Sequence, residues 1–122
     1  MSKRAAERTL ASAAILFAAL GDETRLALLQ QLSRQGPTPI SALANNFDVT
    51  RQGVTKHLHV LAAAGIIVGR REGREHVWAL NPAGLAQVGR CLDLVARGWD
   101  DALANLKAHI EKDDRQDDRQ DR

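Results

Sequence analysis

The chain of 122 residues has the length of a single domain, and its 44% hydrophobic residues suffice for a core. No apolar run reaches the roughly 18 residues that cross a bilayer, so we expect a soluble, intracellular protein with no membrane partner. The single cysteine, Cys91, excludes an internal disulfide and any metal site that needs two cysteines from one chain.

The net charge of +2 conceals an uneven distribution. From Glu111 to the end, six acids stand against four bases, whereas residues 51–76 contain five Arg or Lys against two Glu. A local excess of positive charge indicates a polyanionic partner.

Capping residues and apolar spacing predict the first two helices. Residues 1–6 form a flexible start, and a helix runs from about Glu7 to Leu20. Asp22 caps a second helix, which ends near Gly36. Its inward face is predicted to carry Leu26, Leu29 and Leu32.

The next segment predicts a helix-turn-helix. Thr38 is the expected N-cap of a third helix and Pro39 its first residue, a position that suits proline. Apolar residues at i, i+3, i+4 and i+7 extend that helix from Ile40 to Phe47. Thr50 caps a fourth helix, which ends at Gly65 and whose core face carries Val54, Leu58 and Leu61.

A hairpin follows the fourth helix. The β-rich runs "IIVGRR" and "EHVWAL" flank the turn residues Glu72, Gly73 and Arg74. The predicted fold is therefore mainly α with a small β-hairpin, a winged helix-turn-helix with five helices in the order α-α-α-α-β-β-α.

A long amphipathic helix begins after the Asn81-Pro82 cap. Its apolar stripe from Leu85 to His109 covers 25 residues and so spans roughly 37 Å, more than a domain of this size covers. We expect a homodimer through the first and last helices, although the stripe could instead pack on the chain's own first helix. The predicted interface residues are Phe17, Leu92, Val95, Trp99, Leu103 and Leu106. The domain thus spans residues 7–112, and the polar residues 113–122 form a disordered charged tail.

The outward face of the fourth helix suits double-stranded DNA. In a winged helix-turn-helix, the second helix of the pair enters the major groove with its first turns against the bases. Gln pairs with adenine and Arg with guanine, while arginines of the hairpin reach the flanking backbone. The alternative is a solvated helix followed by an arginine-rich turn. The predicted contacts are Thr50, Arg51, Gln52, Thr55, Lys56, His57 and His59 in the helix and Arg70, Arg71, Arg74 and His76 in the hairpin.

Three stretches carry a family resemblance: "LFAALGDETRLALLQQL", "ISALANNFDVTRQGVTKHLHVLAAAGIIVGRREGREHVWAL" and "GWDDALANLKAHIEKD". Together, from about Leu16 to Lys112, they resemble the ArsR/SmtB family of bacterial transcriptional repressors. The most specific marker is "VTKHLHVLAAAGII", where the family has an S-x-H-L-x-x-L-x-x-A-G-L run and where His57 takes the histidine position. The resemblance implies a cytoplasmic homodimer that binds an operator palindrome and represses transcription.

Many members of that family release DNA when a metal binds, but the usual ligand patterns are missing. The third helix, "ISALANNF", has no cysteine or histidine. Along the last helix the candidates Asp93, Asp100, Asp101, His109 and Glu111 do not follow the family's Asp-x-His pattern with a distant His and Glu. We therefore expect no metal and no cofactor, and the inducer is unknown.

Two alternatives to a DNA-reading repressor remain open. One is a metal- or thiol-responsive repressor with a non-standard sensor site at the dimer interface, where Cys91 is the candidate thiol. The other is a protein-interaction module on the same fold. An enzyme is not expected, because no nucleophile–base set, phosphate loop or pair of carboxylates in a cleft is found.

Overall fold

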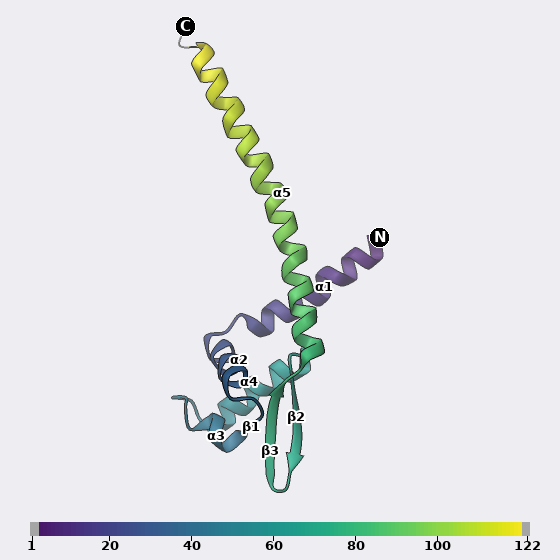
Figure 1. Ribbon diagram of the computed structural model, residues 1–122, viewed down its shortest axis with the longest axis vertical. Helices are drawn as coiled ribbons and strands as arrows, with labels where there is room; N and C mark the ends of the chain where they lie inside the picture. Colours follow the sequence, from purple (N-terminus) through teal and green to yellow (C-terminus); the bar gives the residue numbers. More distant parts are fainter. Residues whose placement is uncertain (1–2, 121–122) are drawn as a thin grey trace. The chain divides into compact units, whose positions relative to one another are not determined.

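The computed structural model describes residues 3–120 (Figure 1). Contacts divide the chain into two units, Met1–Gly89 and Arg90–Arg122. The division falls inside the last helix and inside the single domain predicted over residues 7–112. Among the described residues, no helix is both long and apolar enough to cross a membrane.

The first helix, α1 (Lys3–Leu20), starts earlier than predicted. Residues 3–6 are helical, in keeping with "KRAA", which consists of good helix formers. The predicted flexibility of this start stays a prediction. The helix buries Ala13, Leu16 and Ala19.

The second helix, α2 (Glu23–Gln35), has the predicted ends but a different inward face. The Asp22 carboxylate accepts a hydrogen bond from the Arg25 backbone N–H at 3.0 Å, and Gly36 ends the helix with a φ of 74°. Leu28, Gln31 and Leu32 are buried, whereas Leu26, predicted to face inward, is 51% exposed. The buried face differs from the predicted one because α2 packs against both α4 and β3.

The segment after α2 corrects the prediction for Thr38 and Pro39. These two residues form a short strand, β1 (Thr38–Pro39), rather than the start of a helix. They pair with Trp78 and Val77 of β3, and a proline is tolerated there because β1 is an edge strand. The third helix, α3, is correspondingly short, Ile40–Ala44, and has no side-chain cap.

The fourth helix, α4 (Arg51–Ala63), matches the prediction. Thr50 caps it by accepting a hydrogen bond from the Gly53 N–H at 3.0 Å. Val54, Leu58 and Leu61 are fully buried. Together with Leu28, Leu32, Leu43 and Ile66 they form the core between the helices and the sheet.

The predicted hairpin is present and forms the wing, which we define as β2 (Ile67–Glu72) and β3 (Glu75–Leu80). The two strands are antiparallel, with Glu72 opposite Glu75, and Gly73 takes a φ of 62° in the turn. Since β1 pairs with the other edge of β3, the sheet has three strands in the order β1-β3-β2.

The last helix, α5 (Pro82–Gln120), continues through residues for which the sequence predicts disorder. Polar side chains at i, i+4 spacing meet along this part of the helix, as for His109 Nε2 and Asp113 Oδ2, which lie 3.7 Å apart. Residues 121 and 122 of the predicted tail lie outside the described residues.

The start of α5 is held against the end of α4. The Asn81 side-chain amide donates to the Gly65 carbonyl at 2.9 Å, and the Asn81 N–H donates to the Ile66 carbonyl at 2.9 Å. Gly84, one turn later, lies so close that a Cβ at this position would be 1.8 Å from the Gly65 carbonyl oxygen.

Gly84 and Gly89 should therefore respond in opposite ways to alanine. Gly84→Ala forces the backbones of α4 and α5 apart, and we expect a loss of about 1–3 kcal/mol in the free energy of unfolding. A Cβ at Gly89 meets nothing within 4 Å, so Gly89→Ala should be neutral or stabilise by up to about 1 kcal/mol. Urea unfolding of the two variants measures both effects, and equal losses would contradict the close approach.

Candidate nucleic-acid interface

Three exposed polar residues lie along one side of α4. Gln52, Lys56 and His59 are spaced by four and three residues, so they share a helix face, and all three are exposed. Val54, Leu58 and Leu61 take the opposite, buried face. This separation leaves a polar stripe, which we define as Gln52, Lys56 and His59, free to meet a ligand along the helix.

The first turn of α4 uses two of the predicted contact residues for its own structure. The Thr50 hydroxyl accepts the Gly53 N–H, so Thr50 serves as a cap. The half-buried Thr55 donates its hydroxyl hydrogen to the Arg51 carbonyl at 2.9 Å. In this arrangement Thr55 offers acceptor lone pairs, which suit an amino group and not a phosphate. Arg51 itself is exposed at the end of the helix.

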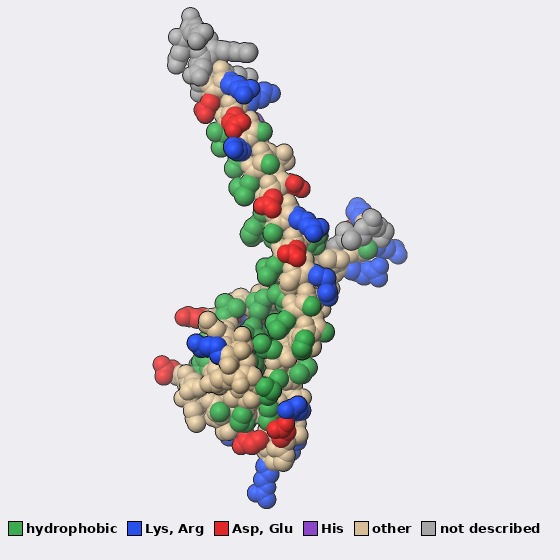
Figure 2. Space-filling view, in the orientation of Figure 1, with side chains coloured by type: hydrophobic (Ala, Val, Ile, Leu, Met, Phe, Trp, Pro, Cys, Tyr) green, Lys and Arg blue, Asp and Glu red, His purple; other side chains and the backbone are tan. Residues whose placement is uncertain are grey.

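The wing places the predicted arginines at the surface. Arg70, Arg71 and Arg74 are all exposed, and Figure 2 shows basic side chains at the hairpin end of the molecule. Arg70 is paired with Glu72, the Nη2 atom lying 2.7 Å from Oε1. An ion pair between two exposed side chains is weak, so Arg70 can leave Glu72 and bind another anion.

The fourth wing residue in the predicted set, His76, is half-buried and stacks on Trp78. The ring centroids lie 4.4 Å apart with an angle of 21° between the planes. Trp78 also meets His59 of α4, with ring centroids 5.9 Å apart. His59 and His76 therefore lie where the helix and the wing meet.

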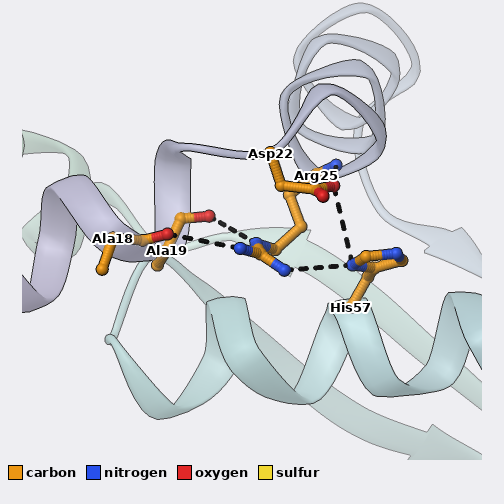
Figure 3. A network of polar contacts seen from close by, with 5 residues as sticks. All are labelled: Ala18, Ala19, Asp22, Arg25 and His57. Carbon is orange, nitrogen blue, oxygen red and sulfur yellow. Dashed lines mark hydrogen bonds and ion pairs between the residues drawn. The ribbon is translucent and has the colours of Figure 1, made fainter.

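His57 lies away from the polar stripe, in a network centred on Arg25 (Figure 3). The Arg25 Nε atom donates to the Ala19 carbonyl at 2.6 Å and Nη2 donates to the Ala18 carbonyl at 3.2 Å. Its Nη1 atom lies 3.2 Å from His57 Nδ1. One guanidinium thus joins the end of α1, the start of α2 and the middle of α4.

His57 Nδ1 faces two charged side chains of this network. Arg25 Nη1 lies 3.2 Å from it and Asp22 Oδ2 lies 3.7 Å from it. Because arginine has only donors, the contact with Arg25 is a hydrogen bond when Nδ1 accepts. His57 thus contributes to the packing of α4 against the ends of α1 and α2, with a side chain 24% exposed, and its contact with DNA stays a prediction.

Sequence reasoning missed the role of Arg25. The signal was present in "GDETR", which holds both the Asp22 cap and Arg25, but nothing in the local pattern points to a histidine 32 residues later. The contact depends on how α2 and α4 pack against each other, and the spacing of apolar residues within either helix does not predict it.

The predicted dimer residues fall on both units. On Arg90–Arg122, the exposed apolar stripe of α5, which we define as Leu92, Trp99, Leu103, Leu106 and Ile110, steps by three, four and seven residues along one side. Trp99 is 68% exposed and Leu103 62%, and Figure 2 shows hydrophobic side chains along one side of the helix. Val95 and, on α1, Phe17 are half-buried.

No group of three or more His, Cys, Asp or Glu side chains within residues 3–120 is arranged to hold a metal ion. His109 contacts Asp113 along its own helix, and Cys91 is buried as a free thiol.

The Asp22 carboxylate gives the network a dependence on pH. Its pKa lies below the ordinary value of 3.8, chiefly because the Arg25 backbone N–H donates to the ionised form, with further help from the charges of His57 and Arg25 and opposition from desolvation. A lowered native pKa contributes stability that is complete above the unfolded pKa and is lost as the pH falls through the native one.

Asp22→Asn should therefore flatten the acid branch of the stability curve, because asparagine keeps the cap but cannot ionise. Asp22→Ala, which removes the cap as well, should lower stability by about 0.5–2 kcal/mol at neutral pH. Urea unfolding from pH 2 to pH 7 compares the three proteins. An unchanged acid branch in Asp22→Asn would rule out this carboxylate as a source of acid sensitivity.

A model of a helix-turn-helix domain matches residues 20–70. An HTH-type transcriptional regulator of Mycobacterium tuberculosis is 36% identical over 95 residues, which cover 78% of this chain and 85% of the relative. The HTH-type transcriptional repressor SmtB of M. tuberculosis is 35% identical over 94 residues, covering 77% and 67%.

Solved structures of similar proteins have the same fold. An ArsR-like transcriptional regulator from Rhodococcus sp. RHA1 is 38% identical, with a TM-score of 0.67 and coverage of 81% of this chain and 92% of that one. The homodimeric winged helix-turn-helix DNA-binding domain of a possible ArsR-family regulator from Mycobacterium bovis is 26% identical, with a TM-score of 0.63 and coverage of 80% and 88%. The chain thus belongs to the ArsR/SmtB family of helix-turn-helix transcriptional regulators and is not an enzyme.

Proposed function

We propose that this regulator is a cytoplasmic homodimeric repressor that reads a palindromic operator with α4 and grips the flanking backbone with the wing. The observation that carries the proposal is the polar stripe of α4, which is exposed along the helix and whose last residue, His59, meets Trp78 of the wing. The SmtB relative is named a repressor, and the related domain from M. bovis is named homodimeric and DNA-binding.

Base reading is assigned to the first turns of α4. Gln52 is exposed and carries one acceptor and one donor group, the pair that matches N6 and N7 of adenine. Arg51, exposed at the helix end, suits O6 and N7 of guanine. Thr55, whose hydrogen is donated to Arg51, can accept from the amino group of adenine or cytosine. Lys56 is the phosphate contact of the stripe.

Dimerisation is assigned to α1 and α5. An apolar stripe with side chains half or more exposed is costly in water, since each buried side chain of this size returns roughly 1.5–3 kcal/mol. A second copy of the chain would cover the stripe. Two-fold symmetry then sets the two α4 helices roughly 34 Å apart, in successive major grooves of one duplex face.

The base-reading role is tested first by selecting sites from random duplexes. We expect a palindrome with half-site centres about 10–10.5 base pairs apart. Gln52→Ala should then lose about 1–3 kcal/mol on the selected site and discriminate less between bases at one position of each half-site. The matched control is Lys56→Ala, which should weaken binding to every sequence alike. A uniform loss in both variants would remove Gln52 from base reading.

The wing is tested by its salt dependence. Arg71→Ala should weaken binding to all sequences and reduce the slope of log Kobs against log [salt] by about 1 per subunit. Arg70→Ala, which removes a side chain already paired with Glu72, should change the slope less. Identical slopes for wild type and Arg71→Ala would show that this arginine does not touch phosphate.

The dimer is tested with two leucines of α5. Leu103 lies on the exposed apolar stripe, whereas Leu94 is also exposed but lies on another side of the helix. Leu103→Glu should increase the dimer dissociation constant by at least about tenfold, because it buries a charge in the interface. Leu94→Glu should leave it unchanged. Sedimentation equilibrium measures both, and equal behaviour of the two variants would place the interface elsewhere.

A further inference from the structure

Three rings form a continuous row between α4 and the wing. We define the aromatic row as His59, Trp78 and His76. Trp78 of β3 is 4% exposed, with His76 stacked at a centroid distance of 4.4 Å and His59 tilted by 53° at 5.9 Å. Both separations lie within or at the edge of the 4.5–7 Å range of attractive ring pairs. The row thus connects the last part of the polar stripe to the second strand of the wing.

Gly69 provides the space in which the row lies. It is the cross-strand partner of Trp78. A Cβ at this position would lie 2.5 Å from His76 Nε2 and 2.9 Å from Trp78 Cζ3. No other residue would allow the indole and the imidazole to lie flat across β2, so this glycine and the two rings form one packed unit.

The strand register of the wing places Arg71 next to this packed unit. Arg71 is paired with His76, and residues 69, 71, 76 and 78 share one face of the hairpin because side chains alternate along a strand. Directly opposite side chains of an antiparallel pair are neighbours. Arg70 projects from the other face, where it pairs with Glu72. Of the wing arginines in the two strands, Arg71 is thus the one beside the aromatic row.

The wing is fixed chiefly through β3, whose Val77 and Trp78 are buried and pair with β1. The Ser41 hydroxyl of α3 adds a hydrogen bond to the Glu75 carboxylate at 3.4 Å. In β2, by contrast, only Ile67 is buried, and every residue from Val68 to Glu72 is exposed. The aromatic row adds a contact from α4 to this partly exposed hairpin.

We propose that the aromatic row is the joint that sets the angle of the wing against α4, and that it positions Arg71 for the DNA backbone. His59 and His76 are then positioning residues that act through Trp78. The part about Arg71 rests on the proposed DNA-binding function, whereas the joint itself belongs to the free protein.

The joint is tested without DNA by comparing His59→Ala with His59→Phe. His59 is exposed, so neither change removes core packing. The measurement is ¹⁵N relaxation of the Gly73 and Arg74 amides at the wing tip, with far-UV circular dichroism to confirm folding. Alanine should increase the motion of the tip, and phenylalanine, which keeps a ring against Trp78, should restore the wild-type order. Unchanged order in His59→Ala, or no rescue by phenylalanine, would overturn the joint.

The positioning of Arg71 is tested with a double-mutant cycle on the selected operator. If the row directs Arg71 to phosphate, the fold-loss in affinity caused by Arg71→Ala should shrink by at least about twofold in the His59→Ala background. Equal fold-losses in the two backgrounds would refute the positioning of Arg71. If the wild-type protein shows no preference for any duplex, the proposed function fails and Arg71's role with it, while the relaxation data still decide whether the joint exists.

Discussion

One guanidinium holds three helices together. Arg25 donates to the carbonyls of Ala18 and Ala19 at the end of α1 and to His57 of α4, while its own backbone N–H is bound by the Asp22 cap of α2. Carbonyls at a helix end have no intrahelical partner, so a fixed cation is well placed among them. Because arginine never loses its proton and presents its donors in a rigid plane, the contact fixes angles as well as distances. The direction of α4, and with it everything that α4 presents to a ligand, depends on this contact.

The exposed surface follows from that arrangement. Val54, Leu58 and Leu61 of α4 lie in the core, and His57 contacts Arg25. The polar stripe therefore lies on the remaining, exposed face of α4. Its last residue, His59, meets Trp78 and so links the stripe to the wing. Two histidines two residues apart on α4 thereby serve opposite sides of the helix. One orients α4 within the domain, and the other orients the wing on α4.

The sequence predicts the parts of the fold that depend on short-range chemistry. The caps Asp22 and Thr50, the glycine stops and the wing turn are all found where local hydrogen bonding and backbone conformation require them. The errors arise where distant segments decide. Thr38 and Pro39 resemble a helix start, yet Trp78 and Val77 draw them into the sheet. Leu26 has the spacing of a core residue, but α2 packs on α4 and β3 with another face and leaves Leu26 exposed. The contact of His57 with Arg25 likewise joins residues far apart in the sequence. The spacing of apolar residues predicts which side chains share one face of a helix. Whether that face is buried depends on how the helix packs against the rest of the domain.

We propose above that the first turns of α4 read a DNA sequence. Fluorescence anisotropy tests this with the wild-type protein, its own upstream DNA and a scrambled duplex of equal length, at physiological salt. We expect the upstream DNA to bind at least about 10³-fold more tightly than the scrambled duplex, the ratio typical of specific regulators. Equal affinity for this duplex, for the scrambled duplex and for sites selected from random DNA would contradict it, because binding would then rest on the phosphate backbone alone.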